Sequence, residues 1–135
     1  DVSDDEFETG WQINVRGLLQ STREVVDSMR EKGSGAIIVT GATASLRGKP
    51  FTAAFASAKA GQRSLAQSFA RQLGPEGIHV ALVIVDGGIG TDEQSSDDGT
   101  RLRPSDIAHT VYHLVTQPKS AWSFEVDVRP FKEDW

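Results

Sequence analysis

Polar and apolar positions divide the chain into helical and extended segments. Between residues 4 and 32 apolar side chains recur at helical spacing. Ser3 and Glu6 have the spacing of a capping box, and Gly33 suits the end of the helix. Two glycines interrupt the pattern, so we expect a kink near Asn14. The apolar set comprises Val15, Leu18, Leu19, Val25, Val26 and Met29.

Two continuous apolar runs, AIIVTG at 36–41 and IHVALVIV at 78–85, predict strands buried on both faces. Alternation over 121–129 predicts a third strand. Between the strands, helices are expected over 51–73 and 104–115. The order helix, strand, helix, strand, helix, strand predicts an α/β fold with about three parallel strands and helices on both faces.

Composition excludes several classes of protein. The 135 residues suit one domain, and a net charge of −5 with scattered basic residues argues against nucleic-acid binding. There is no cysteine, which excludes disulfides and thiolate chemistry. No apolar run approaches the roughly 20 residues that span a bilayer, so we expect no membrane segment and a cytoplasmic location.

The segment FASAK places Phe55 and Lys59 one turn apart on a helix face. Alone, this spacing indicates only a core ring beside a solvated amine. The surrounding sequence gives this spacing more significance. It resembles the second half of short-chain dehydrogenases/reductases over the segment GAIIVTGATASLRGKPFTAAFASAKAGQRSLAQSFARQLGPEGIHVALVIVDGGIGT. In that family a strand leads to a catalytic Ser, a helix carries Tyr-x-x-x-Lys, and a later strand leads to a Pro-Gly-x-Ile-x-Thr loop.

The resemblance covers Asp1 to about Arg129 and implies the C-terminal half of a Rossmann-like, doubly wound parallel sheet. The glycine-rich dinucleotide fingerprint of the family is not found in this sequence. We therefore expect residues 1–135 to form a single partial domain, without the N-terminal dinucleotide-binding βαβ part.

Several residues match the family pattern by position. Asn14 corresponds to the Asn that holds a helix kink and a water linked to the active-site Lys, and Lys59 corresponds to that Lys, which binds the nicotinamide ribose. Gly87, Ile89 and Thr91 in DGGIGT correspond to the loop that seats the carboxamide and a nearby phosphate. The resemblance thus implies NAD or NADP as the cofactor.

Three positions depart from that pattern. Phe55 stands at the Tyr position, Ala42 at the Ser position, and Asp86 precedes Gly87 where the family has Pro. Neither Phe nor Ala can donate a proton, and general acid–base help is worth roughly 10²- to 10⁴-fold in rate. A water relayed through Lys59, an acid on the substrate, or an off-register hydroxyl could take over this role. The off-register hydroxyls are those of Thr43, Ser45 and Ser57.

The leading hypothesis is a divergent NAD(P)-dependent oxidoreductase that transfers hydride to or from a carbonyl or alcohol substrate. The alternative is a non-catalytic relative that binds a dinucleotide or a protein partner. In the family the two long helices, here 4–32 and 51–73, form an oligomer interface, so a homodimer or homotetramer is expected.

Two further signals are set aside. His109 and His113 have the spacing of a metal-binding pair, but no nearby carboxylate completes a ligand set, and we expect no metal site. The acidic run at 91–100 has the position of a substrate lid in the family, and a solvated loop is the simpler interpretation.

Overall fold

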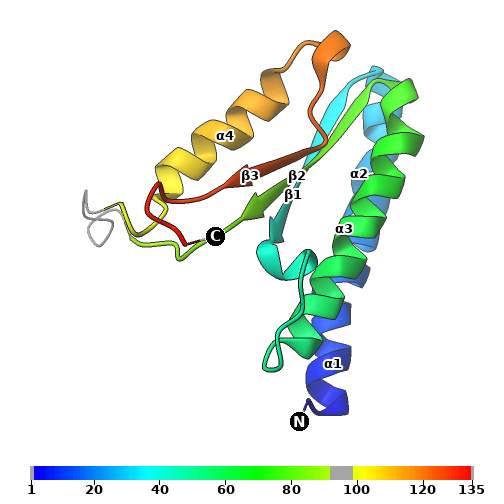
Figure 1. Ribbon diagram of the computed structural model, residues 1–135. Coiled ribbons are helices and arrows are strands. Elements are labelled where there is room, and N and C mark those ends of the chain that lie inside the picture. Colours follow the sequence, from blue (N-terminus) through cyan, green and yellow to red (C-terminus); the bar gives the residue numbers. More distant parts are fainter. Residues whose placement is uncertain (1, 92–98, 135) are drawn as a thin grey trace.

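Three parallel strands form the centre of the molecule in the computed structural model, which describes residues 2–91 and 99–134. Strand β1 (Gly35–Ala42) pairs with β2 (Ile78–Val85), and β2 pairs with β3 (Glu125–Val128). The strands alternate along the chain with helices (Figure 1), so each connection is a crossover. The predicted α/β architecture is confirmed.

Helices cover both faces of the sheet, as predicted. Helices α2 (Gly17–Lys32) and α3 (Ala53–Leu73) pack on one face, and α4 (Pro104–Thr116) packs on the other (Figure 1). Successive residues of a strand point to opposite faces, so β2 must be apolar on both and therefore has a continuous apolar sequence. The α2/α3 side contains Val39, Ala66, Leu82 and Ile84, and the α4 side contains Ala81, Val83 and Leu114.

The N-terminal helical segment begins at the predicted capping box. Ser3 Oγ accepts a hydrogen bond from the backbone N–H of Glu6, and the Ser3 N–H donates to Glu6 Oε2 at 3.0 Å. Helix α1 (Asp4–Trp11) then passes through a π-helical turn, η1 (Gln12–Arg16), into α2. Gly33 ends α2 with φ of 63°, a left-handed conformation that glycine adopts without strain.

Small residues allow α1 to lie directly against α3. A Cβ placed on Gly10 would lie 3.5 Å from Ala58 Cβ and 3.4 Å from the carbonyl oxygen of Ala54. A Cβ on Gly61 would lie 2.9 Å from the ring of Trp11, closer than packed side chains approach. Helix α1 therefore packs closely against α3.

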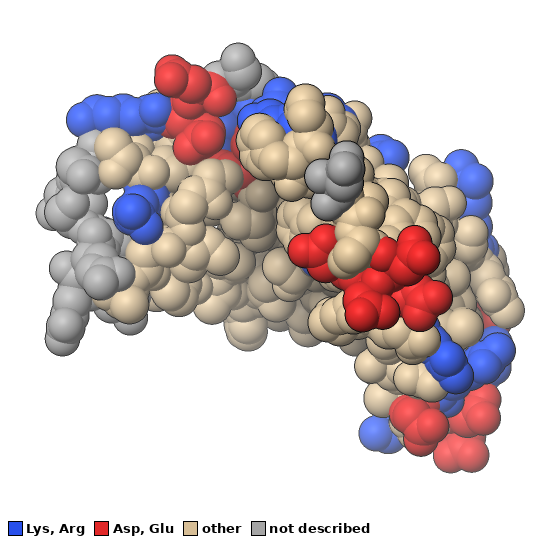
Figure 2. All heavy atoms as spheres, turned by 90° about the horizontal axis from the view of Figure 1, so that it is seen from below, with Lys and Arg blue, Asp and Glu red and all other residues tan. Residues whose placement is uncertain are grey.

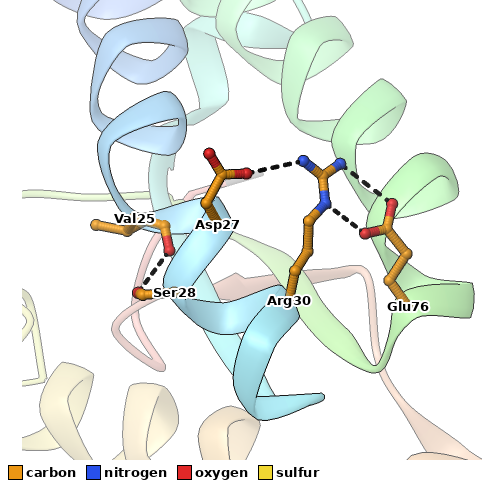
Figure 3. Close-up of polar contacts among 5 residues, drawn as sticks. All are labelled: Val25, Asp27, Ser28, Arg30 and Glu76. Carbon is orange, nitrogen blue, oxygen red and sulfur yellow. Dashed lines mark hydrogen bonds and ion pairs between the residues drawn. The ribbon is translucent and has the colours of Figure 1, made fainter.

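An ion pair ties the end of α2 to the short 3₁₀ turn η3 (Gly74–Glu76), which follows α3. Arg30 donates from Nε to Glu76 Oε2 at 2.6 Å and from Nη2 to Glu76 Oε1 at 3.3 Å, and it also contacts Asp27 (Figure 3). The bidentate geometry raises the pKa of Arg30 and lowers that of Glu76, chiefly through this hydrogen bond. The pair is solvent-exposed, so its main effect is to fix the position of the turn.

The predicted third strand over 121–129 is too long, because β3 comprises only Glu125–Val128. The residues before it form a compact connection held by Gln117. Trp122 Nε1 donates to the Gln117 carbonyl oxygen at 3.2 Å, and the Ser123 N–H donates to Gln117 Oε1 at 2.9 Å. The alternating pattern there reflects packing of this connection, which sequence periodicity does not distinguish from a strand. The other predicted element boundaries are within one or two residues of the structure.

The surface carries its charge in separate groups. Figure 2, which looks at the end of the molecule where the strands finish, shows groups in which acidic and basic side chains lie beside one another, with broad uncharged surface between the groups. Within the described residues, no helix is both long and apolar enough to cross a membrane.

Candidate active site

A pocket of about 870 Å³ lies where β1 and β2 end, between these strand ends and helices α1 and α3. The carboxyl edge of a parallel sheet is where open α/β folds bind ligands. Six of the residues selected from the sequence line this pocket, and Thr91 does not. These six are Asn14, Ala42, Phe55, Lys59, Gly87 and Ile89. Their roles stay predictions.

Lys59 brings the positive charge of the pocket close to the end of β1. Its Nζ donates to the carbonyl oxygen of Thr40 at 2.9 Å and to Gln62 Oε1 at 3.0 Å. Burial lowers the pKa of the Lys59 amine below its ordinary value. The same Nζ lies 5.9 Å from the centre of the Phe55 ring, within range of a cation–π contact.

Gln62 is a site residue that sequence reasoning missed. It is buried in α3 and orients Lys59 through a side-chain hydrogen bond. The sequence feature that could have identified Gln62 is its position three residues after Lys59, which places both side chains on one face of the helix.

Asn14 lies inside the π-helical turn η1, which confirms the irregularity predicted at this position. Its Nδ2 donates to the carbonyl oxygen of Gly10 at 2.9 Å, and the N–H of Gly17 bonds to the Gln12 carbonyl oxygen across the wider turn. A π-helical turn disturbs the regular backbone ladder and is frequently found at functional sites. The irregular turn brings Asn14 to the wall of the pocket.

Phe55 and Ala42, which the sequence comparison matches to the Tyr and Ser positions, both line the pocket. The Phe55 side chain is 47% exposed, so the ring is a wall of an open site rather than part of the core. Of the three off-register hydroxyls, Ser57 donates to the backbone of its own helix and Ser45 is buried away from the pocket. Thr43 remains, and its hydroxyl lies at the end of β1.

Thr43 donates from Oγ1 to Asp86 Oδ1 at 2.7 Å, joining the ends of β1 and β2. Asp86 Oδ2 lies 3.6 Å from Arg129 Nε, just beyond the end of β3. The side chains of Asp86 and Arg129 are only 13% and 16% exposed. Sequence reasoning noted Asp86 only as a departure from the family pattern, because nothing in the chain order indicates that these three groups meet.

The loop after β2 needs glycine at position 87. Its φ is 134°, and an added Cβ would lie 2.7 Å from Cδ of Pro130. Ile89 then forms an isolated bridge with Leu102, which returns the chain towards α4. Most of the acidic run that was interpreted as a solvated loop, residues 92–98, lies outside the described residues.

The histidine pair is exposed on α4, with His113 beside Gln117. Within residues 2–91 and 99–134, no group of three potential ligand side chains is placed to hold a metal ion.

The parallel sheet, covered on both faces and with a pocket at its carboxyl edge, defines an α/β protein of the Rossmann-like class. The family model described as short chain dehydrogenase matches residues 1–102. The chain therefore belongs to the short-chain dehydrogenase family, as its motifs predict.

Similar proteins match nearly the whole chain but are longer. A short-chain dehydrogenase from Rhodopseudomonas palustris is 41% identical, with a TM-score of 0.80 over 96% of this chain and 54% of its own. An uncharacterized oxidoreductase of Staphylococcus aureus strain MRSA252 is 27% identical over 96% of this chain and 57% of its own. An alcohol dehydrogenase from Thermococcus sibiricus, solved with 5-hydroxy-NADP, has a TM-score of 0.78 at 23% identity and covers 99% and 57%. This chain thus spans little more than half the length of these relatives.

Proposed function

We propose that the natural protein containing this chain, called the whole protein below, is an oxidoreductase that uses a nicotinamide dinucleotide. It transfers hydride between the cofactor and a carbonyl or alcohol substrate. The observation that carries the proposal is the convergence of the predicted cofactor residues, led by Lys59, on one pocket at the carboxyl edge of the sheet. Family membership supports the same activity.

The geometry of Lys59 fits the ribose of such a cofactor. An ammonium group has three N–H donors, and Thr40 and Gln62 account for two of them. The third donor is available for a hydroxyl of a ligand in the pocket. Ala42, Phe55 and other apolar side chains form walls suited to a flat ring.

The other proposed cofactor contacts are assigned from the place of each residue in the pocket and from its match to the family pattern. Asn14 and Lys59 would hold the ribose end, while Gly87 and Ile89 would border the nicotinamide carboxamide. Thr91 would reach the phosphate from the loop beyond the pocket. The cofactor, when bound, supplies or accepts hydride, and the chain's own residues orient it and exclude water. The Thermococcus sibiricus neighbour, solved with 5-hydroxy-NADP, supports a cofactor of this class.

The first prediction tests the cofactor site with Lys59→Met in the whole protein. Met retains the length and apolar stem of Lys but loses the charged donor, which is worth about 1.5–3 kcal/mol in a charge-assisted hydrogen bond. We expect the affinity for NADH or NADPH, measured by calorimetry, to fall by about 10- to 100-fold. Lys32→Met, on the exposed end of α2, is the matched control and should bind like the wild type. Equal affinities for both variants would contradict the proposal.

A non-catalytic dinucleotide-binding protein is the second candidate. The observation that favours it is the absence of a side-chain hydroxyl at Ala42 and Phe55, which both face the pocket. Binding of NADH or NADPH without turnover of any carbonyl or alcohol in a broad panel would select this candidate over the enzyme.

We also propose that two copies associate through the surface formed by α1, α2 and α3. An apolar groove of about 310 Å³ on α1, η1 and α2 supports this surface as the contact. The groove is lined chiefly by Phe7, Trp11, Val15 and Leu19. The cytoplasmic location stays a prediction.

A further inference from the structure

The pocket lacks the hydroxyls expected at positions 42 and 55, but a hydroxyl and a carboxylate meet beside it. Ala42 and Val85 are the last paired residues of β1 and β2, and Thr43 and Asp86 directly follow them. The parallel register therefore places Thr43 Oγ1 and Asp86 Oδ1 side by side, 2.7 Å apart. The sheet, rather than a mobile loop, fixes this contact.

The carboxylate is held on both of its oxygens. Oδ1 accepts a hydrogen bond from the Thr43 hydroxyl, and Oδ2 faces Arg129, which also pairs with Asp127 at 3.0 Å. The backbone N–H of Asp86 donates to the Val128 carbonyl oxygen at 2.9 Å, which anchors the residue to β3. A group fixed in this way is already oriented for proton transfer, and positioning is a main part of general acid–base catalysis.

The pair borders the candidate active site. Thr43 and Asp86 line a cavity of about 250 Å³, together with Arg47, Lys49, Glu133 and Phe55. Phe55 also lines the large pocket, so its ring is a wall shared by the two cavities. The chain neighbours Ala42 and Gly87 line the large pocket as well. A substrate beside a nicotinamide in the large pocket can therefore extend its polar end towards Thr43.

We propose that Thr43 and Asp86 form the proton relay of this enzyme, an inference that rests on the proposed function. In alcohol oxidation the substrate C–H bond breaks and its hydrogen leaves with both electrons as hydride, for which the oxidised nicotinamide dinucleotide is the acceptor. The substrate O–H proton passes to Thr43 Oγ1, while the proton of Thr43 passes to Asp86 Oδ1. The substrate gains a C=O double bond, and carbonyl reduction reverses each transfer.

The second prediction compares Asp86→Asn with wild type in the whole protein. Asn retains an oxygen acceptor for the Thr43 hydroxyl, but a neutral amide does not take up the proton. We expect turnover of a panel of secondary alcohols to fall by about 100-fold or more, with unchanged affinity for NADH and NADPH. Glu125→Gln is the matched control, because Glu125 pairs with Arg63 and lines neither cavity, so this variant should keep wild-type turnover.

Further variants separate proton transfer from a structural role. Thr43→Val removes the hydroxyl at nearly constant volume and should lose turnover, whereas Thr43→Ser should keep it. Added formate should restore part of the turnover of Asp86→Ala, because a small carboxylate can occupy the vacated space. Independently of turnover, the carboxyl-carbon NMR signal of Asp86 should move when isopropanol is added, and that of Glu125 should not.

Each failure has a distinct meaning. Wild-type turnover by Asp86→Asn or by Thr43→Val would overturn the relay and leave the proposed oxidoreductase intact. Cofactor binding without any turnover by the wild-type protein would also overturn the relay. Failure of the wild-type protein to bind NADH or NADPH would refute the proposed function itself. The relay, which rests on that function, would then also be refuted.

Discussion

His79 lies in the buried strand β2 with both ring nitrogens facing backbone carbonyl oxygens. Nδ1 lies 3.0 Å from the oxygen of Leu114 and Nε2 lies 2.8 Å from that of Ser123. A neutral imidazole has one N–H and satisfies one of these oxygens, whereas an imidazolium satisfies both. The ring also stacks on Trp122, with centroids 4.6 Å apart and planes 3° apart. This residue therefore joins the end of α4 and the approach to β3 to the centre of the sheet.

The third prediction is that His79→Leu is strongly destabilising. Leu fills a similar volume but removes the ring nitrogens that face the carbonyl oxygens of Leu114 and Ser123, and it offers no donor in their place. We expect the free energy of unfolding, measured by urea denaturation, to fall by about 2–3 kcal/mol. His109→Leu, exposed on α4, should change it by less than about 0.5 kcal/mol. Similar values for the two variants would show that the His79 contacts contribute little.

At the scale of the element, the pocket depends on how closely α1 lies against α3. An added Cβ would lie 3.4 Å from the Ala54 carbonyl oxygen at Gly10 and 2.9 Å from the Trp11 ring at Gly61, so both glycines lie close to the neighbouring helix. This approach brings Asn14 and Lys59 to the lining of one pocket. A wider spacing would separate the residues proposed to hold the cofactor.

The fourth prediction compares two helical glycines. Glycine costs about 1 kcal/mol relative to alanine within a helix, so Gly→Ala stabilises where space permits. At Gly17 the nearest atom to an added Cβ is 3.6 Å away, and Gly17→Ala should raise the free energy of unfolding by about 0.5–1 kcal/mol. At Gly61 the added Cβ would meet Trp11 at 2.9 Å, and Gly61→Ala should lower it by about 1–3 kcal/mol.

Urea denaturation of both variants measures this difference. The outcome that would contradict the packing is an equal stabilisation by Gly61→Ala and Gly17→Ala. NADH affinity of Gly61→Ala gives a second readout, since displacement of α1 would also move Asn14 away from the pocket.

At the scale of the whole molecule, exposed apolar side chains mark the surface proposed for association. Phe7 is 42% exposed and Trp11 is 38% exposed, and their rings lie 6.2 Å apart in the lining of the apolar groove. Apolar surface of this kind is characteristic of protein contacts. A second copy of the chain would cover it.

The fifth prediction is that Phe7→Glu in the whole protein prevents association. A charge in the groove would have to be desolvated on contact, which costs more than the contact provides. We expect light scattering after size-exclusion chromatography to show the mass of a monomer, with the unfolding free energy of the monomer retained. Tyr112→Glu is the matched control, because Tyr112 is 71% exposed on α4, on the opposite face of the sheet. A monomeric wild-type protein would refute the proposed interface.

The main features of the fold were predictable because they depend on local patterns. The apolar run of β2, the capping box at Ser3 and the terminating Gly33 each identify an element or its boundary. Boundaries were less certain where one side-chain pattern fits two structures. At 121–124 the alternation predicts a strand, but Gln117 folds that segment into a compact connection.

The candidate site was predictable only in part. Asn14, Phe55 and Lys59 were found because they match ordered motifs, and the structure brings them to one pocket. Thr91 was selected because it belongs to the DGGIGT loop, but it does not line the pocket. Gln62 was missed because a polar residue in a helix gives no indication of its burial.

The sequence by itself determined the order of the elements, the parallel architecture and the family, since these follow from periodicity and motifs along the chain. It also determined that positions 42 and 55 carry no hydroxyl, because residue identity requires no folding. Only the tertiary structure decided that Thr43, Asp86 and Arg129 meet. They come from three strand ends far apart in the chain, and parallel registers bring them together. Contacts of that kind depend on distances across the sheet, which no local pattern encodes.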